Sequence, residues 1–317
     1  MTQIVLLLPG QGAQKVGMGR DLAEAFPAAR DVYAAIDDAL DMALTRLAFE
    51  GPSDDLTLTH HAQPALLAHS AATWAVVRDV VQPMVCAAAG HSLGEFSAYH
   101  VAGSLTAPTA ARLVRQRGAL MLDAGAAHPG TMAAILGTLS ESIDSICARA
   151  SAEAGLVVPA NYNAAEQVVI SGERAGVALA MELCKAAGAK RALPLSVSGA
   201  FHSPLMATAA DGLAVALDAV PFEAPQVPIY ACVDAQPVTT VADARRTLLA
   251  QLTSSVQWTK VVSRLATDFP EALFVELGTG NVLTGLVRRI APQLATATCG
   301  TAADVDALLT RLSASVN

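Results

Sequence analysis

The sequence predicts an α/β protein, with a large domain built on a parallel sheet and a smaller subdomain inserted into it. Three observations lead to this prediction. Short apolar runs alternate with longer segments of helical periodicity, as in sheets whose parallel strands are buried on both faces. One such run breaks into Gly90-His91-Ser92-Leu93-Gly94, a pattern typical of a strand, a sharp turn and a helix. Between residues 128 and 197 the alternation gives way to the order βαββαβ.

The composition suits a globular protein with a substantial core. The chain has 317 residues, of which 53% are hydrophobic. It contains no uninterrupted apolar run of about eighteen residues and no basic leader, so we expect a soluble, cytoplasmic protein without a membrane span. A net charge of −8, without a basic run, argues against nonspecific binding of nucleic acid. The five cysteines are scattered singly and no histidine cluster extends beyond His60-His61, so we expect neither a disulfide framework nor a metal site.

The first strand is predicted at residues 4–8 and ends in a glycine-bearing loop, Pro9-Gly10-Gln11-Gly12-Ala13-Gln14. The loop lacks the Lys-Ser/Thr ending of a phosphate loop. Its two amide side chains, Gln11 and Gln14, either hydrogen-bond within the loop or face a site. Helices are then expected over residues 20–40 and 64–80, with Pro64 at the head of the second helix, where its missing N–H does no harm.

The elbow follows a strand-like apolar run at residues 87–89 and leads into a helix that ends near Ala102. Gly90 and Gly94 have no Cβ, so the chain can turn tightly and the helix can pack close to the strand. The hydroxyl of Ser92 is then exposed at a helix N-terminus, as in the nucleophile elbow of α/β-hydrolase-like domains. The alternative is a plain turn in which Ser92 only caps the helix.

A helix predicted over residues 108–124 carries a cation on its apolar stripe. Helical spacing places Arg117 on the same face as Leu113, Leu120 and Met121. A guanidinium does not lose its proton, so one that faces the interior needs an anion opposite it. That anion is either an internal Asp or Glu or a carboxylate of the substrate.

Residues 128–197 are interpreted as a ferredoxin-like subdomain. The predicted elements are strands at 132–136, 156–160, 167–171 and 192–197 and helices at 139–154 and 175–187. The chain is therefore divided into residues 1–127, the first part of the large domain, residues 128–197, the small subdomain, and residues 198–317, the second part of the large domain. The active site is expected in the cleft between them.

The large domain resumes at a tight loop that contains Phe201-His202-Ser203-Pro204. His202 is the best partner for Ser92, because a serine hydroxyl needs a base within hydrogen-bond reach to become nucleophilic. Beyond this loop, strands are predicted at residues 227–233 and 273–277 and helices near 242–252, 258–267 and 282–290.

Together these parts define acyl transfer through an acyl-enzyme. The N–H of Leu93 can stabilise an oxyanion, and the Gln11 loop can supply a second donor, because loops at the carboxyl ends of neighbouring parallel strands converge. No aspartate is an evident candidate for the carboxylate that orients the histidine ring in a triad. Asp123 ends a predicted helix, and Asp144 lies on a predicted exposed face. A backbone or side-chain carbonyl could hold His202 instead, giving a dyad.

Seven motifs, in order along nearly the whole chain, resemble those of malonyl-CoA:acyl carrier protein transacylases. They are Pro9-Gly10-Gln11-Gly12-Ala13-Gln14, Gln63-Pro64-Ala65-Leu66-Leu67, Gly90-His91-Ser92-Leu93-Gly94-Glu95, Arg117-Gly118-x-x-Met121, Gln167-Val168-Val169-Ile170-Ser171-Gly172, Phe201-His202-Ser203-Pro204-Leu205-Met206 and Glu276-Leu277-Gly278-Thr279-Gly280. Any one of these motifs is unspecific, whereas seven in the family's order form a specific signal.

The resemblance implies a role for each catalytic candidate. Ser92 is implied as the nucleophile that becomes malonylated, and His202 as its base. Gln251 is implied to orient His202 through its carbonyl, which would explain the missing acid. Gln11 and the N–H of Leu93 are implied as the oxyanion hole.

The resemblance also implies how the substrate is bound. Arg117 is implied to grip the free malonyl carboxylate, with Met121 and His91 beside the substrate. Phe201 matches the malonyl-type pattern, whereas methylmalonyl-selective relatives carry a Tyr-containing sequence there. Thr279 and Ala13 depart from the family's usual proline and serine, and Tyr99-His100 replaces small or aliphatic residues, but none of these removes a group that the mechanism needs.

The implied reaction is a ping-pong transfer of the malonyl group from malonyl-CoA to the phosphopantetheine thiol of holo acyl carrier protein, which supplies extender units for fatty acid synthesis. These two substrates are the expected partners of a monomer without a permanently bound cofactor, metal, nucleic acid or membrane. A closely related alternative is a stand-alone acyltransferase for a polyketide synthase or a malonate decarboxylase carrier. A serine esterase or thioesterase would leave Arg117 without an explanation. A binding protein without activity would not need the nucleophile, base, oxyanion donors and carboxylate anchor that are all present.

Overall fold

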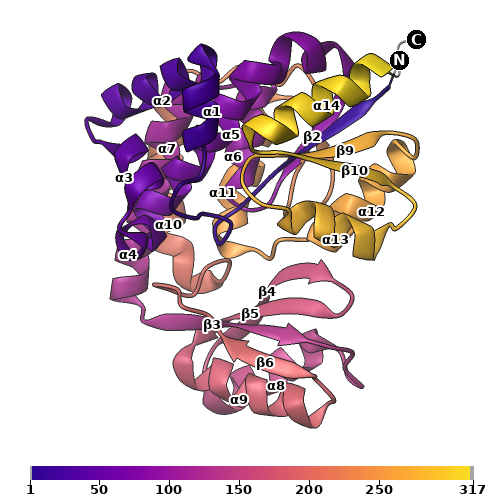
Figure 1. Cartoon of the computed structure of the whole chain (residues 1–317). Helices are drawn as coiled ribbons and strands as arrows, with labels where there is room; N and C mark the ends of the chain where they lie inside the picture. Colours follow the sequence, from indigo (N-terminus) through magenta and orange to yellow (C-terminus); the bar gives the residue numbers. More distant parts are fainter. Residues whose placement is uncertain (1, 315–317) are drawn as a thin grey trace.

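The computed structural model describes residues 2–314 and contains two separate sheets (Figure 1). The larger sheet has six strands in the order β10-β9-β1-β2-β7-β8. Its strands are β1 (Ile4–Leu8), β2 (Val85–Gly90), β7 (Ile229–Tyr230), β8 (Pro237–Val238), β9 (Leu273–Leu277) and β10 (Ala295–Cys299). All pairings from β10 to β7 are parallel, and only β8 runs antiparallel. The predicted parallel-sheet core is thereby confirmed.

Strand β1 is the centre of the large sheet and all five of its residues are buried. Leu6 and Leu8 belong to one hydrophobic cluster and Val5 and Leu7 to another, so the strand has a core on each face. Leu8 is paired with Gly90, the last residue of β2. The loop that follows β1 and the turn that follows β2 therefore leave the sheet side by side.

Helices cover both faces of the large sheet (Figure 1). They are α1 (Arg20–Ala25), α2 (Pro27–Leu40), α3 (Leu44–Glu50), α4 (Ser53–Thr57), α5 (Thr59–Val81), α6 (Gly94–Val101), α7 (Ala107–Ala127), α10 (Ala207–Asp218), α11 (Val241–Thr253), α12 (Trp258–Asp268), α13 (Val282–Ile290) and α14 (Ala302–Ala314), with short 3₁₀ turns at Gln82–Met84 and Pro204–Met206. No helix within residues 2–314 is long and apolar enough to cross a membrane.

The smaller sheet is antiparallel throughout, with the strand order β4-β5-β3-β6. Its elements are β3 (Gly130–Leu136), α8 (Ile143–Ala154), β4 (Val157–Ala164), β5 (Gln167–Glu173), α9 (Arg174–Ala186) and β6 (Arg191–Pro194), in the predicted order βαββαβ. Helices α8 and α9 bury one face over a core of its own that includes Ile135, Ile146 and Ile170. Met132 and Val169 instead join the core of the large part.

The small sheet is joined to the large part by its strand β4. Val256, just after α11, donates its N–H to the carbonyl of Ala160 at 2.8 Å and accepts from the N–H of Tyr162 at 2.9 Å. The hydroxyl of Thr259 adds a bond of 2.9 Å to the carbonyl of Tyr162. The chain segment beyond α11 thus continues the small sheet.

Several predicted elements differ from those observed, among them the strand predicted at 227–233, of which only Ile229–Tyr230 forms a strand. The segment 20–40 forms two helices, because the chain is extended at Phe26 before Pro27. The strand predicted at 192–197 ends at Pro194. The helix predicted to begin at Pro64 begins at Thr59, so this proline lies inside it. A proline cannot bond the carbonyl four residues before it, and the carbonyl of His60 accepts instead from Arg115 Nη1 at 2.6 Å.

Candidate active site

The elbow after β2 depends on two close approaches of the backbone. A Cβ on Gly90 would lie 1.9 Å from the carbonyl carbon of Gly94, and a Cβ on Gly94 would lie 2.0 Å from the carbonyl oxygen of Leu8. Neither position can accept a larger residue unless the backbone shifts, so glycine is required for α6 to pack against β1. Ser92 at the apex has a φ of 51°, a left-handed conformation that is strained for a non-glycine residue.

Ser92 and His202 are hydrogen-bonded, although 110 residues separate them in the chain. Ser92 Oγ lies 2.8 Å from His202 Nε2, and His202 Nδ1 lies 2.7 Å from the backbone oxygen of Gln251. A carbonyl oxygen only accepts, so Nδ1 carries the proton and Nε2 presents a lone pair to the serine hydroxyl. His202 also has a positive φ, of 58°. The main-chain carbonyl of Gln251 therefore holds the imidazole with its unprotonated nitrogen toward Ser92.

Burial holds His202 in its neutral form. Desolvation, and then the nearby positive charge of Arg117, lower the pKa of His202 to about 3. At neutral pH the ring is unprotonated and free to accept the proton of Ser92.

Arg117 is buried, with 1% of its surface exposed. Nη1 donates to Gln63 Oε1 at 2.8 Å, and Nη2 donates to Gln251 Oε1 at 2.7 Å and to Ser92 Oγ at 3.1 Å. Its guanidinium also lies over the ring of Phe96, 5.7 Å from the centroid. Within residues 2–314 these hydrogen bonds go to amide and hydroxyl oxygens, and no carboxylate pairs with Arg117. A directly paired Asp or Glu, one of the two alternatives from the sequence, is therefore excluded for the described residues; the carboxyl group of Glu95 reaches Arg117 only through the Gln251 amide.

Desolvation lowers the pKa of Arg117 to about 10, so the group remains a cation at neutral pH. A buried cation without a directly paired anion is costly, and the cost falls when an anion binds beside it. The site is thus suited to a ligand with a negative group close to Ser92.

Two backbone N–H groups beside Ser92 have no acceptor in the part of the chain that is described. They belong to Leu93, at the start of the α6 turn, and to Gln11, in the loop after β1. The side chain of Gln11 is turned away toward the hydroxyl of Thr59, at 3.2 Å. Since Leu8 and Gly90 are neighbours in the sheet, both N–H groups lie at the same sheet edge.

A cavity of about 390 Å³ opens over Ser92 and is lined by residues of both parts of the chain. Its walls include Gln11, Leu93, Arg117, Met121, Phe201 and His202 from the large part and Met132, Asn161, Asn163 and Val169 from the small sheet. His91 donates from Nε2 to Asn163 Oδ1 at 2.8 Å and its ring packs 5.5 Å from that of Trp258. Burial lowers the pKa of His91, so it is a neutral wall of the cavity.

All nine residues predicted from the sequence lie in or directly behind this cavity. Sequence reasoning did not assign Gln63, Glu95 or Asn163, although each has a polar contact with a site residue. Gln63 and Glu95 each stand beside apolar helical runs, a signal of buried polar groups that could have identified them. Within residues 2–314, no group of three or more His, Cys, Asp or Glu side chains is arranged to hold a metal ion.

Comparison with known proteins connects this geometry to a family. A family model described as the acyl transferase domain matches residues 5–305. The malonyl CoA-acyl carrier protein transacylase of Bacillus subtilis is 43% identical over 297 residues, which is 93% of each chain. The chain belongs to the malonyl CoA-acyl carrier protein transacylase family. It is an acyltransferase, and the resemblance seen in the seven motifs is confirmed.

Solved structures of the transacylase family share the whole architecture. An acyl-carrier-protein S-malonyltransferase from Bartonella henselae is 41% identical and superposes with a TM-score of 0.94, covering 98% of this chain and 99% of that one. A malonyl-transacylase in complex with its type II PKS acyl-carrier protein is 40% identical, with a TM-score of 0.92, 98% of this chain and 100% of that one being covered. The transacylase fold therefore extends over nearly all of this chain.

Proposed function

We propose that this acyltransferase moves the malonyl group from malonyl-CoA to the phosphopantetheine thiol of holo acyl carrier protein, through a malonyl ester on Ser92. One observation carries the malonyl assignment: Arg117 is a buried cation, held by two neutral amides, with Nη2 only 3.1 Å from Ser92 Oγ. An acyl group with a free carboxylate would bring the missing anion to this position. The product would supply extender units for fatty acid synthesis.

In the first half-reaction, His202 Nε2 takes the proton of Ser92 as Oγ attacks the thioester carbonyl. The N–H groups of Leu93 and Gln11 stabilise the oxyanion, and loss of one such donor typically costs about 2.7–4 kcal/mol. The carbon–sulfur bond then breaks, the thiolate of CoA takes the proton from His202, and malonyl-Ser92 remains.

The second half-reaction reverses these steps with another thiol. His202 takes the proton from the phosphopantetheine thiol, and the thiolate attacks the malonyl ester of Ser92 through the same oxyanion hole. Ser92 leaves with the proton from His202, so the enzyme returns to its starting state. Gln251 supports both steps through its backbone carbonyl, which holds His202 Nδ1 at 2.7 Å.

The donors of Arg117 allow a two-bond contact with the malonyl carboxylate. Each Nη carries two N–H groups, and Gln63 and Gln251 take one from each. One N–H remains on each nitrogen, and the one on Nη2 now contacts Ser92 Oγ. Met121, Phe201 and His91 would form the walls around the rest of the acyl group.

The finer description of the fold is part of the proposal. The strand order β4-β5-β3-β6 and its antiparallel pairing support a ferredoxin-like subdomain over residues 128–197. The parallel sheet and the Ser92 elbow support a hydrolase-like domain formed by residues 1–127 and 198–317. We propose in addition that the enzyme works in the cytoplasm as a monomer and without a bound cofactor.

The direct test is intact-protein and peptide mass spectrometry after brief exposure to malonyl-CoA. Ser92 should gain one malonyl group, and addition of holo acyl carrier protein should remove it and yield malonyl-carrier. Ser92→Ala should take up no label. Label that persists in Ser92→Ala, or malonate released mainly to water with carrier present, would contradict the proposal.

A polyketide carrier is the second candidate acceptor. The observation that favours it is the similarity to the malonyl-transacylase in complex with its type II PKS acyl-carrier protein. Measuring kcat/KM for malonyl transfer to a fatty acid carrier and to a polyketide carrier from the same source would decide between the two.

A further inference from the structure

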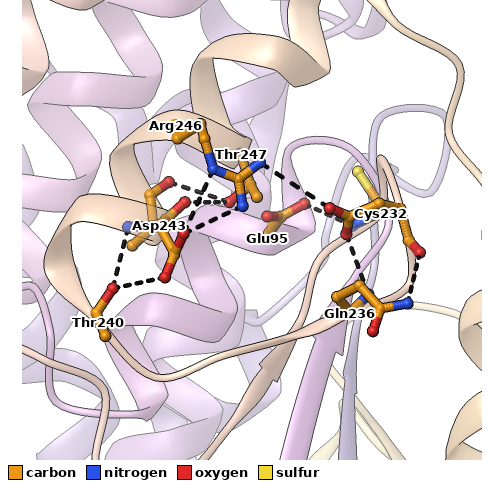
Figure 2. A network of polar contacts seen from close by, with 9 residues as sticks. Glu95, Cys232, Gln236, Thr240, Asp243, Arg246 and Thr247 are labelled. Atoms are coloured by element: carbon orange, nitrogen blue, oxygen red, sulfur yellow. Dashed lines mark hydrogen bonds and ion pairs between the residues drawn. The ribbon is translucent and has the colours of Figure 1, made fainter.

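One buried ionisable side chain beside the site has no part in the mechanism above. Glu95, in the first turn of α6, is fully buried and does not line the cavity. Its Oε2 accepts from the backbone N–H of Cys232 at 3.1 Å and from Gln251 Nε2 at 3.0 Å. Figure 2 shows the carboxyl group of Glu95 beside Cys232. The carboxyl group thus connects the elbow helix to α11, which carries Gln251.

The turn that contains Cys232 is itself fixed to α11. Asp234 in this turn accepts from the N–H of Gln236 at 3.0 Å and pairs with Arg246 of α11 at 4.0 Å. Arg246 also pairs with Asp243 at 3.2 Å, and the Thr240 side chain bonds the same Asp243 at the helix start (Figure 2). Glu95 therefore contacts two groups, the Cys232 N–H in this turn and the Gln251 amide on α11.

The side-chain amide of Gln251 has a donor end and an acceptor end, and its neighbours decide which way it points. Nε2 donates to Glu95 and to the backbone oxygen of Ser92, at 3.0 Å each, while Oε1 accepts from Arg117 Nη2 at 2.7 Å. In the reversed orientation, the oxygen would face two acceptors and the NH₂ would face a guanidinium, which has only donors. Glu95 is one of the two acceptors that prevent this reversal.

We propose that Glu95 is a positioning residue for the acyl carboxylate: it keeps the amide oxygen of Gln251 on Arg117 and so holds the guanidinium toward Ser92. The inference rests on the proposed role of Arg117 in malonyl binding. This positioning role requires a hydrogen-bond acceptor at position 95 rather than a negative charge, because Oε2 can accept whether the carboxyl group is ionised or neutral.

The test compares Glu95→Met with Glu95→Gln, which keeps an acceptor oxygen in nearly the same place. The readout is kcat/KM for acylation of Ser92 by malonyl-CoA and by acetyl-CoA, which lacks the second carboxylate. Glu95→Met should lower the malonyl-to-acetyl ratio by about 10-fold, in line with the loss of the hydrogen bond that fixes the Gln251 amide. Glu95→Gln should stay within about 3-fold of the wild-type ratio.

Two further measurements separate positioning from a general loss of structure. In an Arg117→Ala background, Glu95→Met should change the ratio by less than about 2-fold, because residues that act through one another are not additive. Glu276→Met is the matched control: Glu276 is equally buried and its oxygens accept the N–H groups of Leu283 and Thr284. It should lower the melting temperature and leave the ratio unchanged.

Three results would overturn the inference. They are a wild-type ratio in Glu95→Met, equal losses for both acyl groups, and a Glu95→Gln variant as impaired as Glu95→Met. If Glu95→Met does not fold, Glu95→Ala takes its place, since the smaller side chain leaves room for a water to bond the Cys232 N–H. Failure of the proposed function is distinguishable, because the wild type itself would then not be malonylated at Ser92.

Discussion

At the scale of single residues, Arg117 is held firmly without being neutralised. A carboxylate in the place of Gln63 or Gln251 would cancel the guanidinium charge, whereas amide oxygens at 2.8 and 2.7 Å fix its direction and leave the charge in place. An anionic acyl group bound as proposed would pair directly with a cation that Glu95 reaches only through Gln251.

Arg117→Ala should therefore impair malonyl transfer selectively. We expect kcat/KM for acylation of Ser92 by malonyl-CoA to fall by about 100-fold or more, as when one partner of a buried charge pair is removed. Acetyl-CoA has no carboxylate to lose and should be affected far less. Rates for both thioesters, measured by quenched-flow mass spectrometry, give the comparison.

Arg115→Ala is the control for the Arg117 prediction. Arg115 lies on the same helix, α7, and bonds the carbonyl of His60 rather than the site. Its loss should lower stability and leave the malonyl-to-acetyl ratio unchanged. Equal losses for both acyl groups in Arg117→Ala would mean that Arg117 is structural.

The environment of His202 predicts how the rate depends on pH. Because desolvation and Arg117 lower its pKa to about 3, the imidazole is neutral over the whole range from pH 8 to pH 5.5. The rate of Ser92 malonylation should then vary by less than about 2-fold over this range. A sigmoidal loss of rate with a midpoint near pH 6.5, measured in single-turnover experiments, would disprove it.

The same lowered pKa makes stability depend on pH in a defined direction. Below pH 6.5 the unfolded chain protonates this histidine while the folded protein does not, so stability is fully present above pH 6.5 and is lost as the pH falls toward 3. His202→Asn should flatten the dependence by up to about 1.4 kcal/mol per pH unit in that window. Urea unfolding at several pH values measures the slope, and identical slopes would contradict the assignment.

The sequence predicted the residues whose neighbours in the chain are distinctive. Ser92 lies between two glycines and His202 precedes a Ser-Pro pair, so both could be recognised locally. Their apolar surroundings could mark Gln63 and Glu95 as buried polar residues but not assign them a role, because that role comes from contacts with Arg117 and Gln251, far away in the chain. Only the tertiary fold brings α7 and α11 together, so the local sequence does not reveal these contacts.

At the scale of elements, the elbow depends on how closely α6 approaches β1. The backbone of Gly94 is in contact with the carbonyl of Leu8, and a Cβ would overlap that oxygen at 2.0 Å. Both the proposed oxyanion hole and the direction of Ser92 depend on this contact, since Gln11 follows β1 and Leu93 immediately precedes α6.

Gly94→Ala should thus be much more harmful than the same change elsewhere. We expect it to lower the free energy of unfolding by about 3 kcal/mol or more, because only backbone atoms can yield. Gly285→Ala is the matched control within α13: nothing lies within 4 Å of its added Cβ, and alanine should stabilise the helix by about 0.5–1 kcal/mol. Urea denaturation of both variants gives the comparison, and similar effects would contradict the packing argument.

Helices and strands were predicted best where apolar residues stand out clearly from polar flanking residues. Strand Ile4–Leu8, entirely apolar, was predicted to the residue, whereas Ala295–Cys299 was missed because it alternates small Ala and Thr residues at the sheet edge. Pro64 indicated a helix start that the structure places at Thr59. Arg115 donates to the carbonyl of His60, which an internal proline leaves without its usual helical partner. No local sequence pattern predicts this contact.

At the scale of the whole molecule, the active site needs both sheets to be correctly placed. The large part supplies Ser92, His202 and Arg117, while Asn163 and Val169 of the small sheet close the cavity. The backbone bonds of Val256 to Ala160 and Tyr162 join the two. Because Val256 follows the helix of Gln251, the segment that positions the base also anchors the small sheet.

The two parts should therefore unfold together. Differential scanning calorimetry is expected to give one transition, with equal van't Hoff and calorimetric enthalpies. Two resolved transitions would show that the small sheet has an independent stability and that the bonds through Val256 do not couple the parts.

The carbonyl behind His202 also has a consequence for the kind of bond that can be exchanged. With a main-chain oxygen rather than an anion at Nδ1, and a guanidinium nearby, the imidazolium formed during attack is poorly stabilised and must give up its proton quickly. A sulfur leaving group, with a thiol pKa of about 8.5, departs without waiting for that proton, whereas an amide nitrogen cannot. This base therefore favours acylation of Ser92 by thioesters over cleavage of amides. The preference comes from the leaving group and does not depend on how the substrate fits the cavity.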